Sequence, residues 1–306
     1  MVELPPFTGS SFSGYLTVNK TYNSNMFFWF FPSQTEYSPS TPVILWMNGG
    51  PGTSSLLGLF VELGPILIDA KGDIQPRPIT WNKNYHLLFI DNPVGAGFSF
   101  TLDKRGFALN EDDVAQNLYE CLTQFFRIFT DYASNPFFVS GESYAGKYVP
   151  GITYKIHMEN LNPSVKVRIN LKGMTIGDGI CDPINQYDYG NFLYQVGFID
   201  QNEKAYVDSQ IAIMQYNVRQ RRYLDAYLLF DALMDGSVSN TTSFFYNATG
   251  IKYYNNYLHT HEPIDQTYYI PFLNQTSRRK QLHVGNISFC GDLATVVYSL
   301  LNDVVS

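Results

Sequence analysis

Short apolar runs alternate with amphipathic segments along the first half of the chain. Residues 14–19 and 26–32 predict two antiparallel strands joined by a tight polar turn. The later runs are strongly apolar and end in glycine-rich or polar loops, which is typical of buried parallel strands. The segments that predict these strands, with their following loops, are 42–52, 86–100, 136–141 and 168–180.

Two helices are predicted between these strands. Residues 110–129 are amphipathic, with Asn110 as the N-cap and Asp113 at the capping-box position. Cys121 falls on the apolar face of this helix, so we expect an inert core thiol. Residues 146–160 predict the second helix, directly after the strand at 136–141.

The pattern changes near residue 185. Residues 189–236 are helical in pattern with no intervening strand, and 239–263 are polar, aromatic and loop-like. Alternating strands and helices predict an α/β fold whose mostly parallel sheet is covered on both faces. We therefore expect residues 1–184 to form the sheet core. Residues 185–306 are expected to form a helical cap insertion and the start of the return to the core.

Composition narrows the function classes. The 306 residues include 45% hydrophobic and 16% aromatic side chains, which favours a folded domain with a full core. A net charge of −7 with no basic stripe argues against nucleic acid. No apolar run is long enough to span a bilayer, and the first residues lack the pattern of a signal peptide. The three cysteines show no metal-ligand spacing, and we expect no metal and no cofactor.

Two sets of residues bear weakly on the cellular route. Cys181 and Cys290 are candidates for a pair, which sequence alone leaves open. N-x-S/T sequons exceed the number that chance predicts and favour the secretory route, lysosomal or extracellular. These glycosylation candidates are Asn19, Asn240, Asn247, Asn274 and Asn286.

Ser143 is the leading candidate nucleophile. It stands between a predicted strand and a predicted helix, in the stretch "GESYAG", with small residues around it. A nucleophile elbow needs such residues because the turn is strained and the helix packs close behind. Ala145 stands where that motif usually has glycine, which is a minor departure. The alternative is a structural serine in a tight loop.

The stretch "WMNGGPG" at 46–52 predicts a loop that points backbone N–H groups into a cleft. In hydrolases with an elbow, one oxyanion donor follows the nucleophile and the other comes from an earlier loop. Tyr144 and Gly50 are the candidates for these two donors. Alone, the segment would also suit an ordinary turn or a phosphate cradle, although it lacks the spacing of known phosphate loops.

Taken together, several blocks resemble the serine carboxypeptidases, in particular their vitellogenic-like branch. They are "LWMNGGPGTSS", "FVELGPI", "WNKNYHLLFIDNPVGAGFSF", "GESYAGKYVP" and "IGDGICDP". The resemblance covers essentially the whole chain. It implies an α/β-hydrolase fold with a helical cap, and peptide substrates with a free C-terminus.

The resemblance also assigns a substrate clamp. Asn48 and Glu142 correspond to residues that grip the terminal carboxylate, with Trp46 near them and Glu62 as a second buried glutamate. A carboxylate approaches a glutamate only if that glutamate is protonated, and a neighbouring carboxylate raises its pKa. Acidic pH should therefore favour binding. Without the resemblance, Glu62 would be interpreted as a helix-capping or surface acid.

A base for Ser143 is the missing part. His157 follows the elbow too closely, His259 and His261 fall in the polar insertion, and His283 matches a family segment that precedes the acid. Asp292 and Asp303 have no histidine after them. In the resemblance, the triad Asp and His belong to two further strand–loop units, beyond Ser306. We therefore expect a fragment, or one chain of a protein cut in two, that lacks the C-terminal strands and is inactive alone.

Three functions fit these residues. The leading hypothesis is a serine-type carboxypeptidase that releases C-terminal amino acids through an acyl-enzyme on Ser143. The second is an acyltransferase on the same fold, which should not depend on a free carboxylate. The third is a non-catalytic binding protein of the α/β-hydrolase fold.

Overall fold

The structure, a computed structural model, describes residues 1–291 of the chain. Its residues divide into two compact units. The first comprises Met1–Gly179 together with the described residues from Ile264 onward, and the second comprises Ile180–Pro263. No helix among the described residues is long and apolar enough to cross a membrane.

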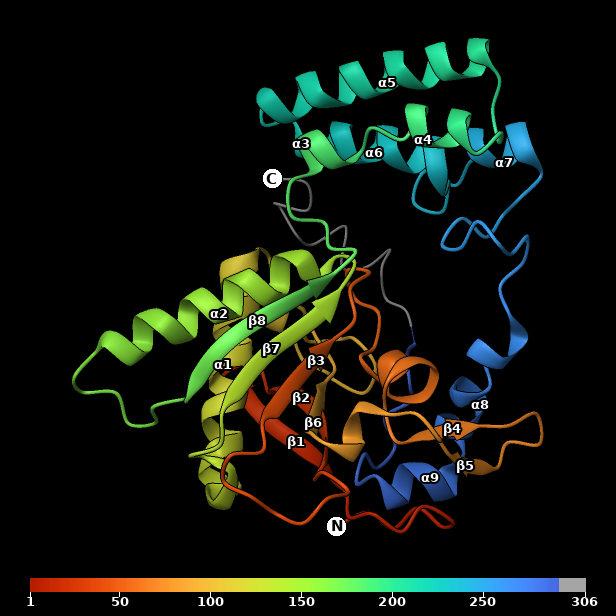
Figure 1. The fold of residues 1–306 in the computed structure, drawn as a ribbon. Helices are drawn as coiled ribbons and strands as arrows, with labels where there is room; N and C mark the ends of the chain where they lie inside the picture. Colours follow the sequence, from red (N-terminus) through yellow and green to blue (C-terminus); the bar gives the residue numbers. More distant parts are fainter. Residues whose placement is uncertain (292–306) are drawn as a thin grey trace. The chain divides into compact units, whose positions relative to one another are not determined.

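A six-stranded sheet forms the centre of the first unit (Figure 1). The first two strands pair antiparallel, and the second pairs antiparallel with β6 (His86–Ile90). From β6 onward all pairings are parallel, so the predicted mostly parallel sheet is confirmed. In spatial order the strands are β1 (Phe12–Asn19), β2 (Ser24–Phe31), β6 (His86–Ile90), β3 (Val43–Met47), β7 (Phe137–Glu142) and β8 (Leu171–Gly177).

Side chains from both faces of the sheet are buried. Every residue of β2 is buried, which explains its unbroken apolar run. Phe28 and Phe30 pack edge-on against Phe125 of α1 (Glu111–Ile128). Trp29 and Phe31 belong to the hydrophobic core on the opposite face, where the Trp29 ring packs edge-on against the Phe60 ring. This alternation follows from the two-residue period of a strand.

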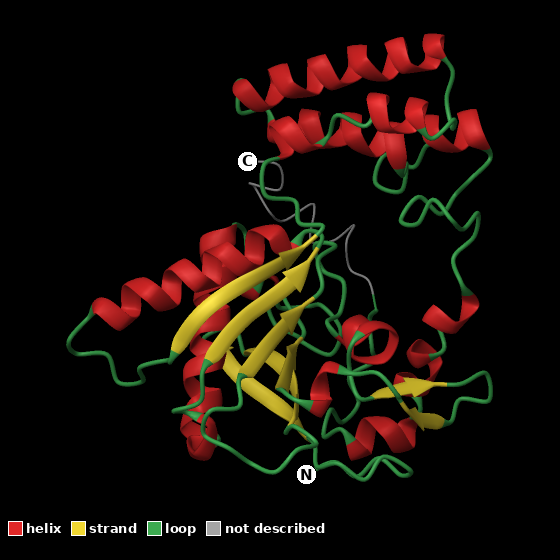
Figure 2. Ribbon diagram, viewed as in Figure 1, coloured by secondary structure: helices red, strands yellow, loops and turns green. Residues whose placement is uncertain are grey.

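Different elements cover the two faces (Figure 2). The first face carries α1 and α2 (Ala145–Leu161). The opposite face is covered by residues from 56–76 and 269–289. These segments include the hairpin β4 (Ile66–Ile68) and β5 (Ile74–Pro76), and the short helices α8 (Tyr269–Asn274) and α9 (Thr276–Gln281).

The first predicted helix begins as the sequence indicates. The side chain of Asn110 accepts a hydrogen bond from the Asp113 N–H at 2.9 Å. The Asp113 carboxylate reaches back to the N–H of Leu109 instead of that of Asn110, so the reciprocal half of the box is displaced by one residue. Cys121 is fully buried in α1, as predicted.

Strand β8 differs from its neighbours in exposure. Among the described residues it pairs only with β7, and it exposes Lys172 and Met174. Interior strands such as β3 are buried along their whole length. Within residues 1–291, the outer edge of β8 therefore presents unpaired backbone groups and apolar surface.

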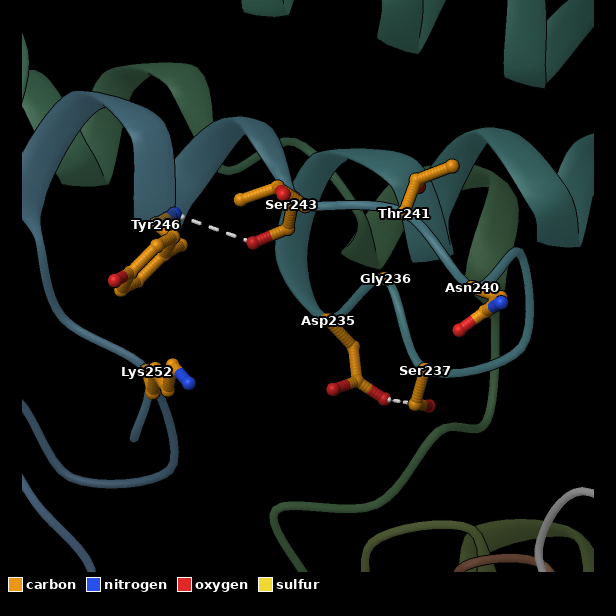
Figure 3. Close-up of a pocket in the computed structure, with 9 residues that line it drawn as sticks. Asp235, Gly236, Ser237, Asn240, Thr241, Ser243, Tyr246 and Lys252 are labelled. Atoms are coloured by element: carbon orange, nitrogen blue, oxygen red, sulfur yellow. Dashed lines mark hydrogen bonds between the residues drawn. The ribbon is translucent and has the colours of Figure 1, made fainter.

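The second unit is helical, which confirms the prediction for 189–236. Asp200 and Glu203 form a complete capping box at the start of its longest helix. Figure 3 shows a polar pocket between α6 (Tyr223–Met234) and α7 (Phe244–Thr249), lined in part by Asp235, Asn240 and Lys252. The helices are α3 (Pro183–Gln186), α4 (Gly190–Gln195), α5 (Gln201–Arg219), α6 (Tyr223–Met234) and α7 (Phe244–Thr249).

Candidate active site

Ser143 sits at a sharp turn between β7 and α2. Its φ of +57° is left-handed, a conformation that L-residues other than glycine seldom adopt. The turn is held from both sides: the Ser143 N–H donates to the Gly177 carbonyl at 3.1 Å, and Gly146 N–H donates to the Ser143 carbonyl at 2.9 Å. The strand–turn–helix context predicted for a nucleophile elbow is present.

Small residues permit this turn. A Cβ at Gly141 would lie 2.6 Å from the Met47 carbonyl oxygen and 2.7 Å from the Cβ of Ala145. Helix α2 therefore packs directly behind the strand, and any side chain at position 141 would push it away. The alanine that departs from the usual motif fits because its methyl group lies in this narrow space.

The loop after β3 packs against the elbow. A Cβ at Gly49 would lie only 2.3 Å from the backbone nitrogen of Tyr144, and Gly50 has a φ of +105°. The two segments predicted to supply oxyanion donors are thus adjacent. The Tyr144 side chain is buried, and its hydroxyl donates to Glu111 at 2.9 Å. This bond ties the elbow to the start of α1.

A buried aspartate anchors the same loop. Asp91 accepts hydrogen bonds from the Ser54 hydroxyl at 2.5 Å and from the Phe98 N–H at 2.8 Å. Burial raises the pKa of Asp91 to about 7. Sequence reasoning did not single out Asp91, although it lies in the quoted block that ends in "IDNPVGAGFSF".

Asn48 joins two glutamates that are far apart in sequence. Its Nδ2 donates to Glu142 Oε1 at 2.8 Å and to Glu62 Oε1 at 3.2 Å. Its Oδ1 accepts from the indole N–H of Trp46 at 3.1 Å and from the Gly58 N–H at 2.9 Å. Both ends of the amide are therefore fixed, which determines that the N–H end points at the carboxyls. The predicted group of Trp46, Asn48, Glu62 and Glu142 is brought together.

Glu62 reaches this position because it ends a π-helical turn, Gly58–Glu62. Burial raises its pKa to about 8, and the charge of Glu142 and a hydrogen bond with that carboxyl act in the same direction. The pKa of Glu142 is also raised, mainly by burial and further by the charge of Asp178. The pair therefore holds a proton at mildly acidic pH. The interpretation of Glu62 as a surface acid is wrong.

Asp178 is a further acidic residue that sequence reasoning missed. It follows β8, and its Oδ1 accepts from the Ser143 N–H at 3.3 Å. Its carboxylate contributes to the raised pKa of both glutamates. Its place after a parallel strand, in the block "IGDGI", was the available signal.

The family model of the serine carboxypeptidases matches residues 3–303. The chain belongs to the serine carboxypeptidase family. This serine carboxypeptidase chain is 48% identical to the probable serine carboxypeptidase CPVL of Pongo abelii, over 98% of its own length and 63% of the relative's. It is 45% identical to the venom serine carboxypeptidase of Apis mellifera, over 97% and 63% respectively. The vitellogenic carboxypeptidase of Aedes aegypti is 39% identical, over 91% and 58%.

The chain thus spans about 60% of the length of the curated relatives that it matches. Among solved structures, the prohormone-processing carboxypeptidase Kex1(delta)p of Saccharomyces cerevisiae matches with a TM-score of 0.76 at 23% identity. That match covers 97% of this chain and 69% of the yeast chain. The serine carboxypeptidase chain therefore has the predicted α/β-hydrolase fold.

No histidine of the described residues forms a hydrogen bond with the Ser143 hydroxyl. His157 is exposed on α2, and the exposed His283 lies 3.3 Å from the Ser13 carbonyl oxygen. His259 and His261 belong to the second unit. Asp292 and Asp303, considered above as acids, lie outside the described residues.

Sequons in this serine carboxypeptidase chain differ in their surroundings. Asn240, Asn247 and Asn286 are exposed, and Asn19 is partly buried. The side chain of Asn274 accepts from the Phe289 N–H at 2.9 Å and also donates to two carbonyl groups. A glycan at Asn274 would compete with these hydrogen bonds.

Within residues 1–291 no cluster of His, Cys, Asp and Glu could hold a metal ion.

Proposed function

We propose that the chain carries the nucleophile and the carboxylate clamp of a serine-type carboxypeptidase, which removes C-terminal amino acids from peptides. The observation that carries this proposal is the hydrogen-bonded group of Asn48, Glu62 and Glu142 beside Ser143. A hydrolase that acts on esters or internal peptide bonds has no need of two glutamates arranged to share a proton.

The clamp recognises a free carboxylate through its proton. Burial and mutual repulsion keep one proton on the Glu62–Glu142 pair, and this proton is donated to the substrate's terminal carboxylate. Asn48 supplies a second donor by exchanging one of its two Nδ2 hydrogen bonds to the glutamates for a bond to the substrate. Binding is therefore favoured at acidic pH and weakens as the pair ionises.

The reaction follows from the geometry of the elbow. The Ser143 hydroxyl attacks the carbonyl carbon of the last peptide bond and transfers its proton to a histidine. The N–H groups of Gly50 and Tyr144 stabilise the oxyanion. The histidine protonates the amine of the leaving C-terminal residue, which departs as a free amino acid. Water then hydrolyses the acyl ester on Ser143 and restores the hydroxyl.

The histidine and aspartate of this mechanism come from outside the described residues. We expect residues 1–306 alone to be inactive, and the proposed partner is the protein's own C-terminal segment as a second chain. Among residues 1–291 strand β8 pairs only with β7, which supports this proposal, because a parallel strand could add at its other edge.

A secretory route, lysosomal or extracellular, belongs to the same proposal. Its support is the set of exposed sequons at Asn240, Asn247 and Asn286, and the relative from Apis mellifera that is named as a venom protein. Glycosidase treatment of the protein purified from eukaryotic cells tests it. An unchanged electrophoretic mobility would contradict the glycoprotein proposal.

The function is tested by release of the C-terminal amino acid from an N-acylated dipeptide by the complete protein. We expect cleavage that is favoured at acidic pH, is lost in Ser143→Ala and Glu142→Gln, and does not occur with the C-terminal amide. Binding of the dipeptide without cleavage would favour the non-catalytic alternative. Transfer of the acyl group to an alcohol with no need for a carboxylate would favour the acyltransferase.

A further inference from the structure

The turn that carries Glu62 is held by an arginine from a later loop. Arg77 donates from Nε to the Gly64 carbonyl at 2.9 Å and from its terminal nitrogen to the Phe60 carbonyl. The backbone N–H of Arg77 donates to the Pro65 carbonyl at 2.8 Å. The guanidinium thus bridges the backbone on both sides of Glu62. It satisfies carbonyl groups that the end of a helical turn leaves without partners.

Two neighbours of Arg77 hold the same turn. The Leu63 carbonyl accepts from the Thr80 hydroxyl at 2.7 Å and from the Trp81 N–H at 3.1 Å. Leu63 is the residue directly after Glu62. Hydrogen bonds from residues 77–81 therefore surround the glutamate from Phe60 to Pro65.

The same segment reaches the other half of the clamp. The Trp81 ring packs edge-on against the Trp46 ring, with centroids 5.6 Å apart. The Trp46 indole donates to Oδ1 of Asn48, which orients the amide that contacts both glutamates. Although Trp81 is 42% exposed, it therefore supports a buried residue of the clamp.

We propose that residues 77–81 form a clamp brace, a positioning element that sets the distance between Glu62 and the amide of Asn48. This inference rests on the proposed function, because it concerns recognition of a free carboxylate. Arg77 and Trp81 touch neither the substrate nor the reacting atoms. They act through Glu62 and Trp46, respectively.

Arg77 serves the clamp mainly through its geometry. Burial lowers the pKa of Arg77 and the charge of Glu62 opposes this shift. The same attraction favours the ionised carboxylate, so charge alone would oppose the proton that the clamp needs. Arg77→Lys keeps the positive charge but replaces the planar fork by a single nitrogen, which does not reproduce the two donor positions of Nε and the terminal nitrogen. Arg77→Met removes both the positive charge and the hydrogen bonds to the two carbonyl groups. Comparison of these variants separates geometry from charge.

The test measures binding of N-acetyl-Phe-Leu and of its C-terminal amide to the Ser143→Ala protein by calorimetry at pH 5.5. We expect the starting protein to prefer the acid. Arg77→Met and Arg77→Lys should each reduce this preference about tenfold, with little change in affinity for the amide. In a Glu62→Gln background, Arg77→Met should have no further effect on the preference.

Arg105→Met is the matched control, because Arg105 pairs with Asp103 at the surface and has a 73% exposed side chain. An equal loss of acid and amide binding in the Arg77 variants would overturn the proposal, since that result indicates general loosening. An unchanged preference for the acid over the amide in these variants would also overturn the proposal. If Arg77→Met fails to fold by circular dichroism, Arg77→Lys and Trp81→Phe decide the question by the same criterion. A starting protein with no preference for the acid would contradict the proposed function instead.

Discussion

Nδ2 of Asn48 lies 2.8 Å from Oε1 of Glu142 and donates a hydrogen bond to it. Oε1 of Glu142 already accepts a hydrogen bond from the Asn48 amide. The proton that Glu62 and Glu142 share therefore lies on one of the other carboxyl oxygens of the pair. An amide at position 48 is therefore required in its observed orientation. An acid of the same shape would supply an acceptor where the clamp needs a donor.

Asn48→Asp should accordingly weaken recognition of the substrate carboxylate. The change removes the N–H donor and adds a negative charge beside two carboxyls. We expect KM for N-acylated dipeptides to rise by at least about tenfold, with a smaller effect on kcat. Steady-state kinetics of the complete protein measure this. Asn202→Asp on the exposed surface of α5 is the control, and an unaltered KM in Asn48→Asp would contradict the assigned role.

Stability should fall as pH rises, because of Glu62. Its pKa is about 8 in the folded protein against an ordinary value of 4.5, so the folded state binds the proton more tightly than the unfolded state does. The free energy of unfolding should therefore decrease between pH about 4.5 and about 8 and change little above that. Glu62→Gln should flatten the dependence.

Urea unfolding at pH 5, 6.5 and 8 measures this effect. Asp91, with a pKa raised to about 7, contributes a slope of the same sign that remains in Glu62→Gln. The exposed Glu36→Gln variant is the control and should keep the full slope. If Glu62→Gln and Glu36→Gln unfold with the same pH dependence, the pKa of Glu62 is not raised.

Sequence patterns predicted the sheet and the elbow because these depend on local order. The apolar run of β2 and the small residues around Ser143 are readable one segment at a time. Glu62 is different, since its meeting with Glu142 needs a π-helical turn and a contact between residues 80 positions apart. No periodic pattern of apolar and polar residues in the sequence encodes that π-helical turn. Only the family resemblance indicated that Glu62 and Glu142 form a pair.

The residues that sequence reasoning missed act through distant backbone groups. Arg77 binds carbonyl oxygens, which every residue has, so its partners leave no trace in the side-chain pattern. Asp91 resembles an ordinary loop residue until burial and its bond to Ser54 are known. Asp178 reaches Ser143 only because β7 and β8 are adjacent and parallel.

Ser143 should carry a measurable conformational cost. A residue with a side chain at a φ of +57° is destabilised relative to glycine, although glycine loses more entropy on folding. We expect Ser143→Gly to be more stable than Ser143→Ala by up to about 1 kcal/mol, while both are inactive. Both variants lack the hydroxyl, so the comparison isolates the backbone. Equal urea midpoints would show that the turn is not strained.

Gly49 should be important for the proposed activity, although it contributes no functional group. A methyl group there would lie 2.3 Å from the Tyr144 nitrogen and 2.9 Å from the Glu142 carbonyl oxygen. Backbone atoms cannot move aside cheaply, so Gly49→Ala must push the oxyanion loop away from the elbow. We expect kcat to fall by about a hundredfold or more, because an oxyanion donor is displaced.

Gly151→Ala provides the matched control for this substitution. Position 151 lies inside α2, where the nearest atom to an added methyl group is the Cβ of Ala115 at an ordinary 3.9 Å. Alanine in a helix interior should raise stability by about 1 kcal/mol and leave kcat unchanged. Steady-state kinetics and urea unfolding of both variants measure these effects. Normal turnover by Gly49→Ala would mean that the loop after β3 does not supply the oxyanion donor, and Gly50 would lose its assigned role.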